Sequence, residues 1–130
     1  MGNQKSYMMF SLEHIQALVD LIGNDALFLE KAQASNLTAQ VAIKLDATDK
    51  IYKFNLEQGR LAKLDFDENA PFVLSAPKEI WEAVFLGRLN PIVGIMQGKI
   101  KLKGDLVKLI PWYGAFNRMF ELFKEIKVSV

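Results

Sequence analysis

The chain has 130 residues, of which 51% are hydrophobic, and its 16 basic and 15 acidic residues give a formal net charge of +1. This length fits one domain. The near-neutral charge argues against nucleic acid as a partner, because nucleic-acid-binding domains usually carry a strongly basic face. Cysteine is absent, which excludes disulfides, zinc-thiolate sites and thiol catalysis and favours a cytoplasmic location.

The two ends of the chain show no targeting or membrane-spanning pattern. The first ten residues lack the apolar core of a secretory signal, and no uncharged run reaches the roughly 18 residues that span a bilayer. The C-terminal sequence Lys127-Val128-Ser129-Val130 is unlike a peroxisomal Ser-Lys-Leu address. We expect residues 1–10 to be frayed and residues 11–130 to form a single domain.

Residues 12–35 show helical periodicity. Apolar residues recur at helical spacing in the first half of this segment: Leu12, Ile15, Leu18, Val19 and Ile22. Ser11 precedes them and is a candidate N-cap. Gly23 separates this helix from a second, shorter one, for which Asp25 is the candidate N-cap and which ends near residue 35.

The hydrophobic period changes from about 3.6 to 2 in the next part of the chain. Apolar and polar residues alternate over residues 37–45, 52–57 and 63–67, and short turns separate the three segments. Three consecutive strands with short turns predict an antiparallel meander with one buried face. Residues 72–76, between Pro71 and Pro77, predict a short fourth strand.

Residues 90–105 combine a short helix with a fifth strand. Asn90 suits an N-cap, Pro91 suits the first helical position, and Gly98 ends the helix. Ile100 and Leu102 then alternate with three lysines, which predicts a strand with one buried side.

Two longer helices flank this stretch. One opens at Pro77 and ends at Gly87; the other starts at Pro111 and runs to about residue 126 with a wide apolar face. Residues 106–110 are either a helical turn or a continuation of the fifth strand. The whole pattern predicts an α+β fold, in which a five-stranded, mostly antiparallel sheet is covered on one face by helices.

The stretch 90–105 also carries a family resemblance. Asn90-Pro91, a short apolar run, Gln97-Gly98-Lys99, alternation and Gly104-Asp105 resemble the signature of the sterol carrier protein type 2 family of non-specific lipid-transfer proteins. The similarity is sharpest over residues 77–109. It implies a hydrophobic tunnel under the helices for fatty acyl, acyl-CoA, sterol-like or isoprenoid lipids. The chain lacks the fused enzyme and peroxisomal tail of the best-known members, so a fatty acyl or isoprenoid ligand is at least as good a candidate as a sterol.

The three late helices supply the candidate lining of such a tunnel. The candidates share large apolar side chains at helical spacing: Trp81, Val84, Phe85, Ile92, Ile95, Met96, Trp112, Phe116, Met119, Phe120 and Phe123. Spacing alone favours an ordinary core, and the resemblance shifts the balance to a tunnel. The terminal helix is either a movable cover over the tunnel, a docked amphipathic helix, or a segment that touches membranes during transfer.

Polar features of the sequence have simpler interpretations. The basic run Lys99, Lys101, Lys103 and Lys108 is the solvated face of a strand or a docking patch for anionic lipid headgroups. The single histidine, His14, lies near the polar border of the first helix and is a structural or solvated residue rather than a metal ligand. The acidic residues of segment 65–68 predict a turn rather than a calcium loop.

These observations favour non-catalytic binding and transfer of an apolar ligand, without a cofactor or metal. An enzyme is disfavoured because one histidine and no cysteine leave few catalytic groups. The alternative is a protein-interaction or dimerisation module, forming a homodimer or serving a lipid-metabolising enzyme. The expected partners of the carrier are an apolar small molecule and, transiently, a membrane.

Overall fold

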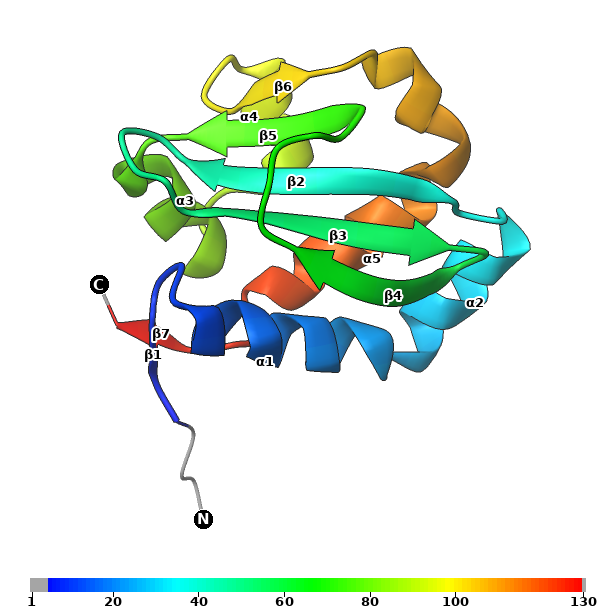
Figure 1. The fold of residues 1–130 in the computed structure, drawn as a ribbon, viewed down its shortest axis with the longest axis horizontal. Coiled ribbons are helices and arrows are strands. Elements are labelled where there is room, and N and C mark those ends of the chain that lie inside the picture. Colours follow the sequence, from blue (N-terminus) through cyan, green and yellow to red (C-terminus); the bar gives the residue numbers. More distant parts are fainter. Residues whose placement is uncertain (1–4, 130) are drawn as a thin grey trace.

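The computed structural model describes residues 5–129 and contains two layers, a sheet and a set of helices (Figure 1). The helices are α1 (Leu12–Gly23), α2 (Ala26–Ala34), α3 (Lys78–Phe85), α4 (Pro91–Met96), the 3₁₀ helix η1 (Leu106–Trp112) and α5 (Tyr113–Phe123). The strands are β1 (Tyr7–Met8), β2 (Ala39–Leu45), β3 (Ile51–Glu57), β4 (Arg60–Asp65), β5 (Phe72–Ala76), β6 (Lys101–Lys103) and β7 (Val128–Ser129). Within residues 5–129, no helix has the length and hydropathy needed to cross a membrane.

The main sheet has five strands in the order β4-β3-β2-β5-β6. The pairs β2–β3, β3–β4 and β5–β6 are antiparallel, and β2–β5 is parallel. The predicted meander and the predicted α+β fold with a mostly antiparallel five-stranded sheet are therefore confirmed. The segment between β4 and β5 runs across the front of the sheet, which lets β5 pair beside β2 instead of β4 (Figure 1).

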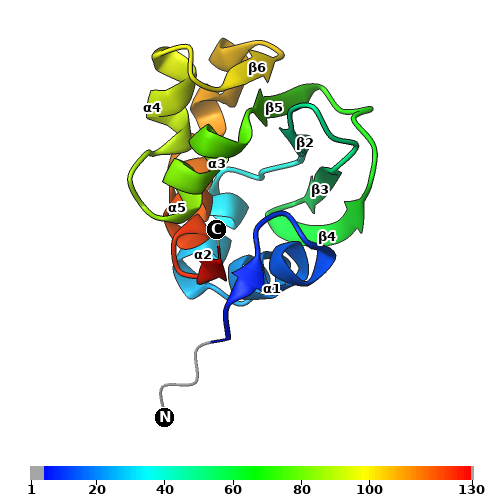
Figure 2. The same ribbon diagram turned by 90° about the vertical axis from the view of Figure 1, so that its left-hand side faces the viewer.

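Helices α3, α4 and α5 lie on one side of this sheet, and α1 lies below its edge strand β4 (Figure 2). Period-2 alternation explains the choice of side, since Val41, Ile43 and Leu45 of β2 belong to the main hydrophobic core. On the opposite face the buried Lys53 holds the crossing segment: its Nζ lies 2.9 Å from an Asp67 carboxylate oxygen and 3.3 Å from the Asn69 carbonyl oxygen. Asp67 of this turn thus forms an ion pair with Lys53.

The predicted helix caps are formed by the side chains that the sequence indicates. Ser11 accepts a hydrogen bond from the His14 N–H, Asp25 from the Phe28 N–H, and Asn90 from the Ile92 N–H. Each cap satisfies a backbone donor that has no partner inside its helix. Local sequence therefore fixes where α1, α2 and α4 begin.

The N-terminal segment differs from the expectation that residues 1–10 are frayed. Residues 1–4 lie outside the described part, but β1 pairs in parallel with β7 at the other end of the chain. Phe10 is fully buried and packs edge-on against Trp81 and Phe85. Its carbonyl oxygen accepts a 2.7 Å hydrogen bond from the Tyr52 hydroxyl. One large aromatic side chain thus anchors this segment to the core.

His14 also differs from its expected place, because it lies in the core and not near the polar border of α1. The side chain is fully buried, and its ring meets Phe85 edge-on with centroids 4.6 Å apart. Its Nδ1 accepts a 3.0 Å hydrogen bond from the Phe10 N–H, so the neutral ring carries its proton on Nε2. Burial lowers the pKa of His14 to about 4.

Folding stability should therefore fall as the pH drops from about 6.5 to about 4. In this window the unfolded chain binds a proton at His14 that the folded chain does not bind, which lowers the free energy of unfolding by at most about 3 kcal/mol. Urea unfolding of the wild type and of His14→Asn at stepped pH measures the effect. The asparagine amide oxygen occupies the position of Nδ1, so it can still accept the Phe10 N–H but does not titrate, and identical pH slopes for the two proteins would contradict the prediction.

Candidate functional site: an apolar pocket

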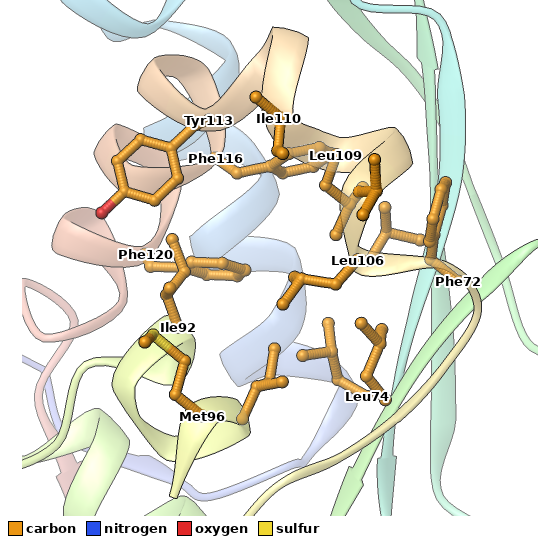
Figure 3. Close-up of a pocket in the computed structure, with 14 residues that line it drawn as sticks. Phe72, Leu74, Ile92, Met96, Leu106, Leu109, Ile110, Tyr113, Phe116 and Phe120 are labelled. Atoms are coloured by element: carbon orange, nitrogen blue, oxygen red, sulfur yellow. The ribbon is translucent and has the colours of Figure 1, made fainter.

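A pocket of about 270 Å³ lies between the sheet and the late helices (Figure 3). Fourteen residues line it, and all but one have side chains without a hydroxyl, amide or charged group: Val41, Phe72, Leu74, Ile92, Ile95, Met96, Leu102, Leu106, Val107, Leu109, Ile110, Tyr113, Phe116 and Phe120. The exception is the Tyr113 hydroxyl. Such a surface attracts hydrocarbon and offers almost no polar anchoring inside the pocket.

The sheet forms one wall of the pocket. Leu74 lies directly opposite Leu102 across the β5–β6 pair, and Val41 lies opposite Phe72 across β2–β5. These residues share the helix-facing side of three adjacent strands, as period-2 alternation requires. The wall is therefore part of the rigid, hydrogen-bonded sheet.

Helix α4 forms a second wall through Ile92, Ile95 and Met96. It approaches the residue before β6 closely at Gly94, where a Cβ atom would lie 2.8 Å from the Ile100 Cδ1 atom. The chain then turns at Gly98 with a φ of +76°, a conformation that glycine adopts without steric cost. The two glycines let a short helix and the following strand line the same pocket.

The remaining walls come from η1 and α5. Helix η1 supplies Leu106, Val107, Leu109 and Ile110, and Asp105 caps its start by accepting a hydrogen bond from the Val107 N–H. Residues 106–110 are thus helical, which decides between the two predicted alternatives. Pro111 lies inside η1, so the last α-helix begins at Tyr113, two residues after the predicted start.

Five of the eleven predicted lining residues meet in this pocket: Ile92, Ile95, Met96, Phe116 and Phe120. The other six lie elsewhere: Trp81, Val84, Phe85, Trp112, Met119 and Phe123. Except for the partly buried Trp112, these six are core residues. Phe85 stacks between Trp81 and Phe123, and the indole N–H of Trp81 donates to the Lys44 carbonyl oxygen at 2.9 Å. Helix α3 therefore packs the core and leaves the pocket to α4, η1 and α5.

Nine lining residues were not among the predicted ones: Val41, Phe72, Leu74, Leu102, Leu106, Val107, Leu109, Ile110 and Tyr113. Strand alternation already placed the sheet residues on the buried face, so their direction was predictable. The signal for η1 was a run of large apolar residues with no core-facing period. The pocket lies between the sheet and late helices, where the tunnel was expected; that it forms a tunnel stays a prediction.

An α+β domain whose sheet and helices enclose a hydrocarbon-lined pocket has the architecture of a small lipid-binding protein. A sequence profile of the SCP-2 sterol transfer family matches residues 16–110. The chain therefore belongs to this family, whose members bind and transfer lipids, and the resemblance found in the sequence is confirmed. A comparison with curated proteins gave no match.

Solved structures share the fold. A crystal structure of sterol carrier protein 2 superposes with a TM-score of 0.80 at 22% identity and covers 91% of this chain and 98% of its own. A conserved hypothetical protein of Thermus thermophilus, described as a possible sterol carrier protein, gives 0.77 at 22% identity, over 97% and 95% of the two chains. The palmitated SCP2L2 of Aedes aegypti gives 0.54 at 17% identity, over 82% and 94%. Identities this low show the fold alone.

Proposed function

We propose that this protein binds the acyl chain of a fatty acid or acyl-CoA in the pocket and transfers it without chemical change. The observation that carries the proposal is the lining: one hydroxyl among fourteen side chains leaves no place inside for a charged headgroup. The head must therefore remain at the surface while the hydrocarbon is buried. Sterol-like and isoprenoid lipids also bury hydrocarbon and keep a polar group at the surface, so they are the competing ligands.

The chemical character of the lining supports a carrier rather than an enzyme. The fourteen lining residues include no carboxylate, imidazole or amine side chain, so no paired acid and base face each other there. The acyl preference is also supported by the Aedes aegypti relative, which is described as palmitated. The cytoplasmic location stays a prediction.

The size of the pocket limits the length of chain that it holds in this conformation. A methylene occupies about as much space as a water molecule, roughly 30 Å³, so a pocket of about 270 Å³ accepts about nine methylenes. At about 0.8 kcal/mol each they contribute roughly 7 kcal/mol before the costs of association. A micromolar complex needs about 8 kcal/mol net, so tight binding requires a longer chain and a wider pocket.

Helix η1 is the wall that we expect to move outward. None of its residues is buried, whereas α5 buries six. Displacing η1 therefore exposes the partly buried Leu109 and Trp112 but no fully buried residue of its own. This assigns the gating role to η1 and leaves α5, the gate considered from the sequence, as a fixed wall.

A chain-length series tests the proposal. We would measure the affinities of saturated fatty acids from eight to sixteen carbons, which should rise about fourfold per added methylene. The rise should stop at about ten carbons if η1 is fixed, and should continue to longer chains if η1 moves outward. Native mass spectrometry with lipid extraction should also find co-purified lipid near one per chain. Phe116→Asp should abolish binding, and Phe66→Asp, the same change at an exposed position, should not. No binding at any chain length would refute the carrier.

The second candidate is a protein-interaction or dimerisation module, which the exposed apolar side chains around the pocket favour. Light scattering over a concentration series separates the two functions. A mass that rises with concentration in a protein that binds no fatty acid would support the interaction module.

A further inference from the structure

Exposed hydrophobic side chains are concentrated around the opening of the pocket, which we call its mouth. Six of the eleven exposed large hydrophobic residues among those described come from α4, η1 and the first residue of α5: Val93, Met96, Leu106, Val107, Ile110 and Tyr113. Met96, Val107 and Ile110 are 74%, 66% and 64% exposed. All but Val93 also line the pocket, so the mouth and the apolar surface are one feature. Figure 3 shows Met96 on one side of the pocket and Ile110 and Tyr113 on the other.

The charge of the chain is concentrated on the same segment. Residues 88–112 contain five basic residues and one acid, a net charge of +4: Arg88, Lys99, Lys101, Lys103 and Lys108 against Asp105. The rest of the chain has eleven basic and fourteen acidic residues, a net charge of −3. All five basic residues are exposed, and none forms an ion pair within residues 5–129.

The lysines lie on the elements that build the mouth. Lys99 occupies the turn between α4 and β6, and Lys108 lies on η1 among the lining residues. Lys101 and Lys103 flank the lining residue Leu102 on β6, the edge strand of the sheet. By strand alternation their side chains point to the opposite side of that edge from Leu102, so they lie beside the mouth and not inside it.

We propose that this mouth, formed by α4, β6 and η1, docks on an anionic lipid bilayer. Exposed apolar side chains enter the headgroup region, and the surrounding lysines bind the anionic headgroups. A second copy of the chain fits the face poorly, because two surfaces of net charge +4 repel each other. An acidic protein would match the positive charge of this surface. It would not explain why the same surface surrounds the opening of a hydrocarbon-lined pocket.

Docking in this orientation gives the bound chain a path between pocket and bilayer that avoids water. That purpose rests on the proposed function, but the contact itself does not, since it is measured on protein without ligand. Fatty-acid binding in vesicle-free solution and vesicle binding of the ligand-free protein can therefore fail independently. The orientation also places η1, the wall expected to move, against the membrane.

Vesicle co-sedimentation tests the docking face. The protein should bind phosphatidylcholine vesicles that contain phosphatidylserine, bind vesicles of phosphatidylcholine alone far more weakly, and dissociate as salt is raised. A basic residue near an anionic surface contributes about fivefold, so the triple variant Lys101→Gln, Lys103→Gln, Lys108→Gln should lose about a hundredfold in partition. The control triple Lys50→Gln, Lys124→Gln, Lys127→Gln removes the same charge from other parts of the surface and should change partition by only a few fold.

A single apolar position separates docking from ligand binding. Val93 is exposed beside the mouth but does not line the pocket. Val93→Asp should weaken vesicle binding at least tenfold and leave fatty-acid affinity in solution unchanged. Equal losses in the two lysine triples, or wild-type vesicle binding by Val93→Asp, would overturn the proposal, as would a protein that binds fatty acid but no anionic vesicle.

Discussion

Replacing Leu74 with tryptophan is expected to weaken fatty-acid binding about thirtyfold while the fold remains intact. Leu74 lies at the centre of β5, paired with Ile43 and Leu102, and lines the pocket. The larger ring can extend into the empty space, where it displaces about two to three methylenes of the ligand. At about 0.8 kcal/mol per methylene the loss is roughly 2 kcal/mol, or about thirtyfold in affinity.

Fluorescent fatty-acid titration and thermal unfolding together check this result. Filling an empty apolar space should leave the melting temperature unchanged or raise it, because the ring gains contacts that the pocket wall lacks. Leu86→Trp is the matched control: it makes the same substitution at an exposed position after α3 that does not line the pocket. Wild-type affinity in Leu74→Trp, with the fold retained, would show that the ligand binds elsewhere.

Local signals in the sequence predicted most of the fold. The strands of the meander follow from alternation and short turns, and the caps at Ser11, Asp25 and Asn90 follow from side chains that satisfy neighbouring backbone groups. The pairing of β1 with β7 had no such signal, because it joins Tyr7 to Val128 through two-residue strands. Long-range contacts between very short segments are outside the reach of periodicity.

The site was predictable only in part for a related reason. Helical spacing showed that Trp81 and Phe85 face inward, but it cannot tell a core position from a pocket wall. That distinction depends on what lies opposite: Phe85 meets Phe10, His14 and Phe123, whereas Phe120 meets the pocket. The buried position of Phe10 explains much of the difference, since this residue was expected in a frayed segment and instead packs against α3.

The walls of the pocket differ in how firmly they are held. The sheet wall is fixed by strand pairing, and α5 is fixed by six buried residues and by an ion pair with the start of α2. Helix η1 is held less firmly: none of its residues is fully buried, and its last residue, Trp112, is tied down by a 3.2 Å hydrogen bond from its indole N–H to the Ser35 carbonyl oxygen. A pocket with two firmly held walls and one loosely held wall can accept chains of different length, which suits a carrier of low selectivity.

The ion pair that fixes α5 should be among the most costly polar contacts to remove. Asp25 accepts two 2.8 Å hydrogen bonds, from Arg118 Nε and Nη2, and a third from the Phe28 N–H at the start of α2. The hydrogen bond from Arg118 is the main cause that holds the pKa of the Asp25 carboxyl below its usual range. Asp25→Ala removes a cap and a bidentate pair together, and we expect a loss of about 2–3 kcal/mol in the free energy of unfolding.

Asp25→Asn separates the two contributions, because asparagine is as good an N-cap as aspartate but cannot form the ion pair. The side chains of Asp25 and Arg118 are 16% and 27% exposed, so the pair lies between the surface and buried classes and should contribute about 1–2 kcal/mol. Urea unfolding of Asp25→Asn should therefore show about half the loss of Asp25→Ala. Arg118→Ala should add little to Asp25→Asn if the two changes break one interaction. Full additivity of the two losses would show that Arg118 stabilises α5 through other contacts and that the ion pair does not hold this wall of the pocket.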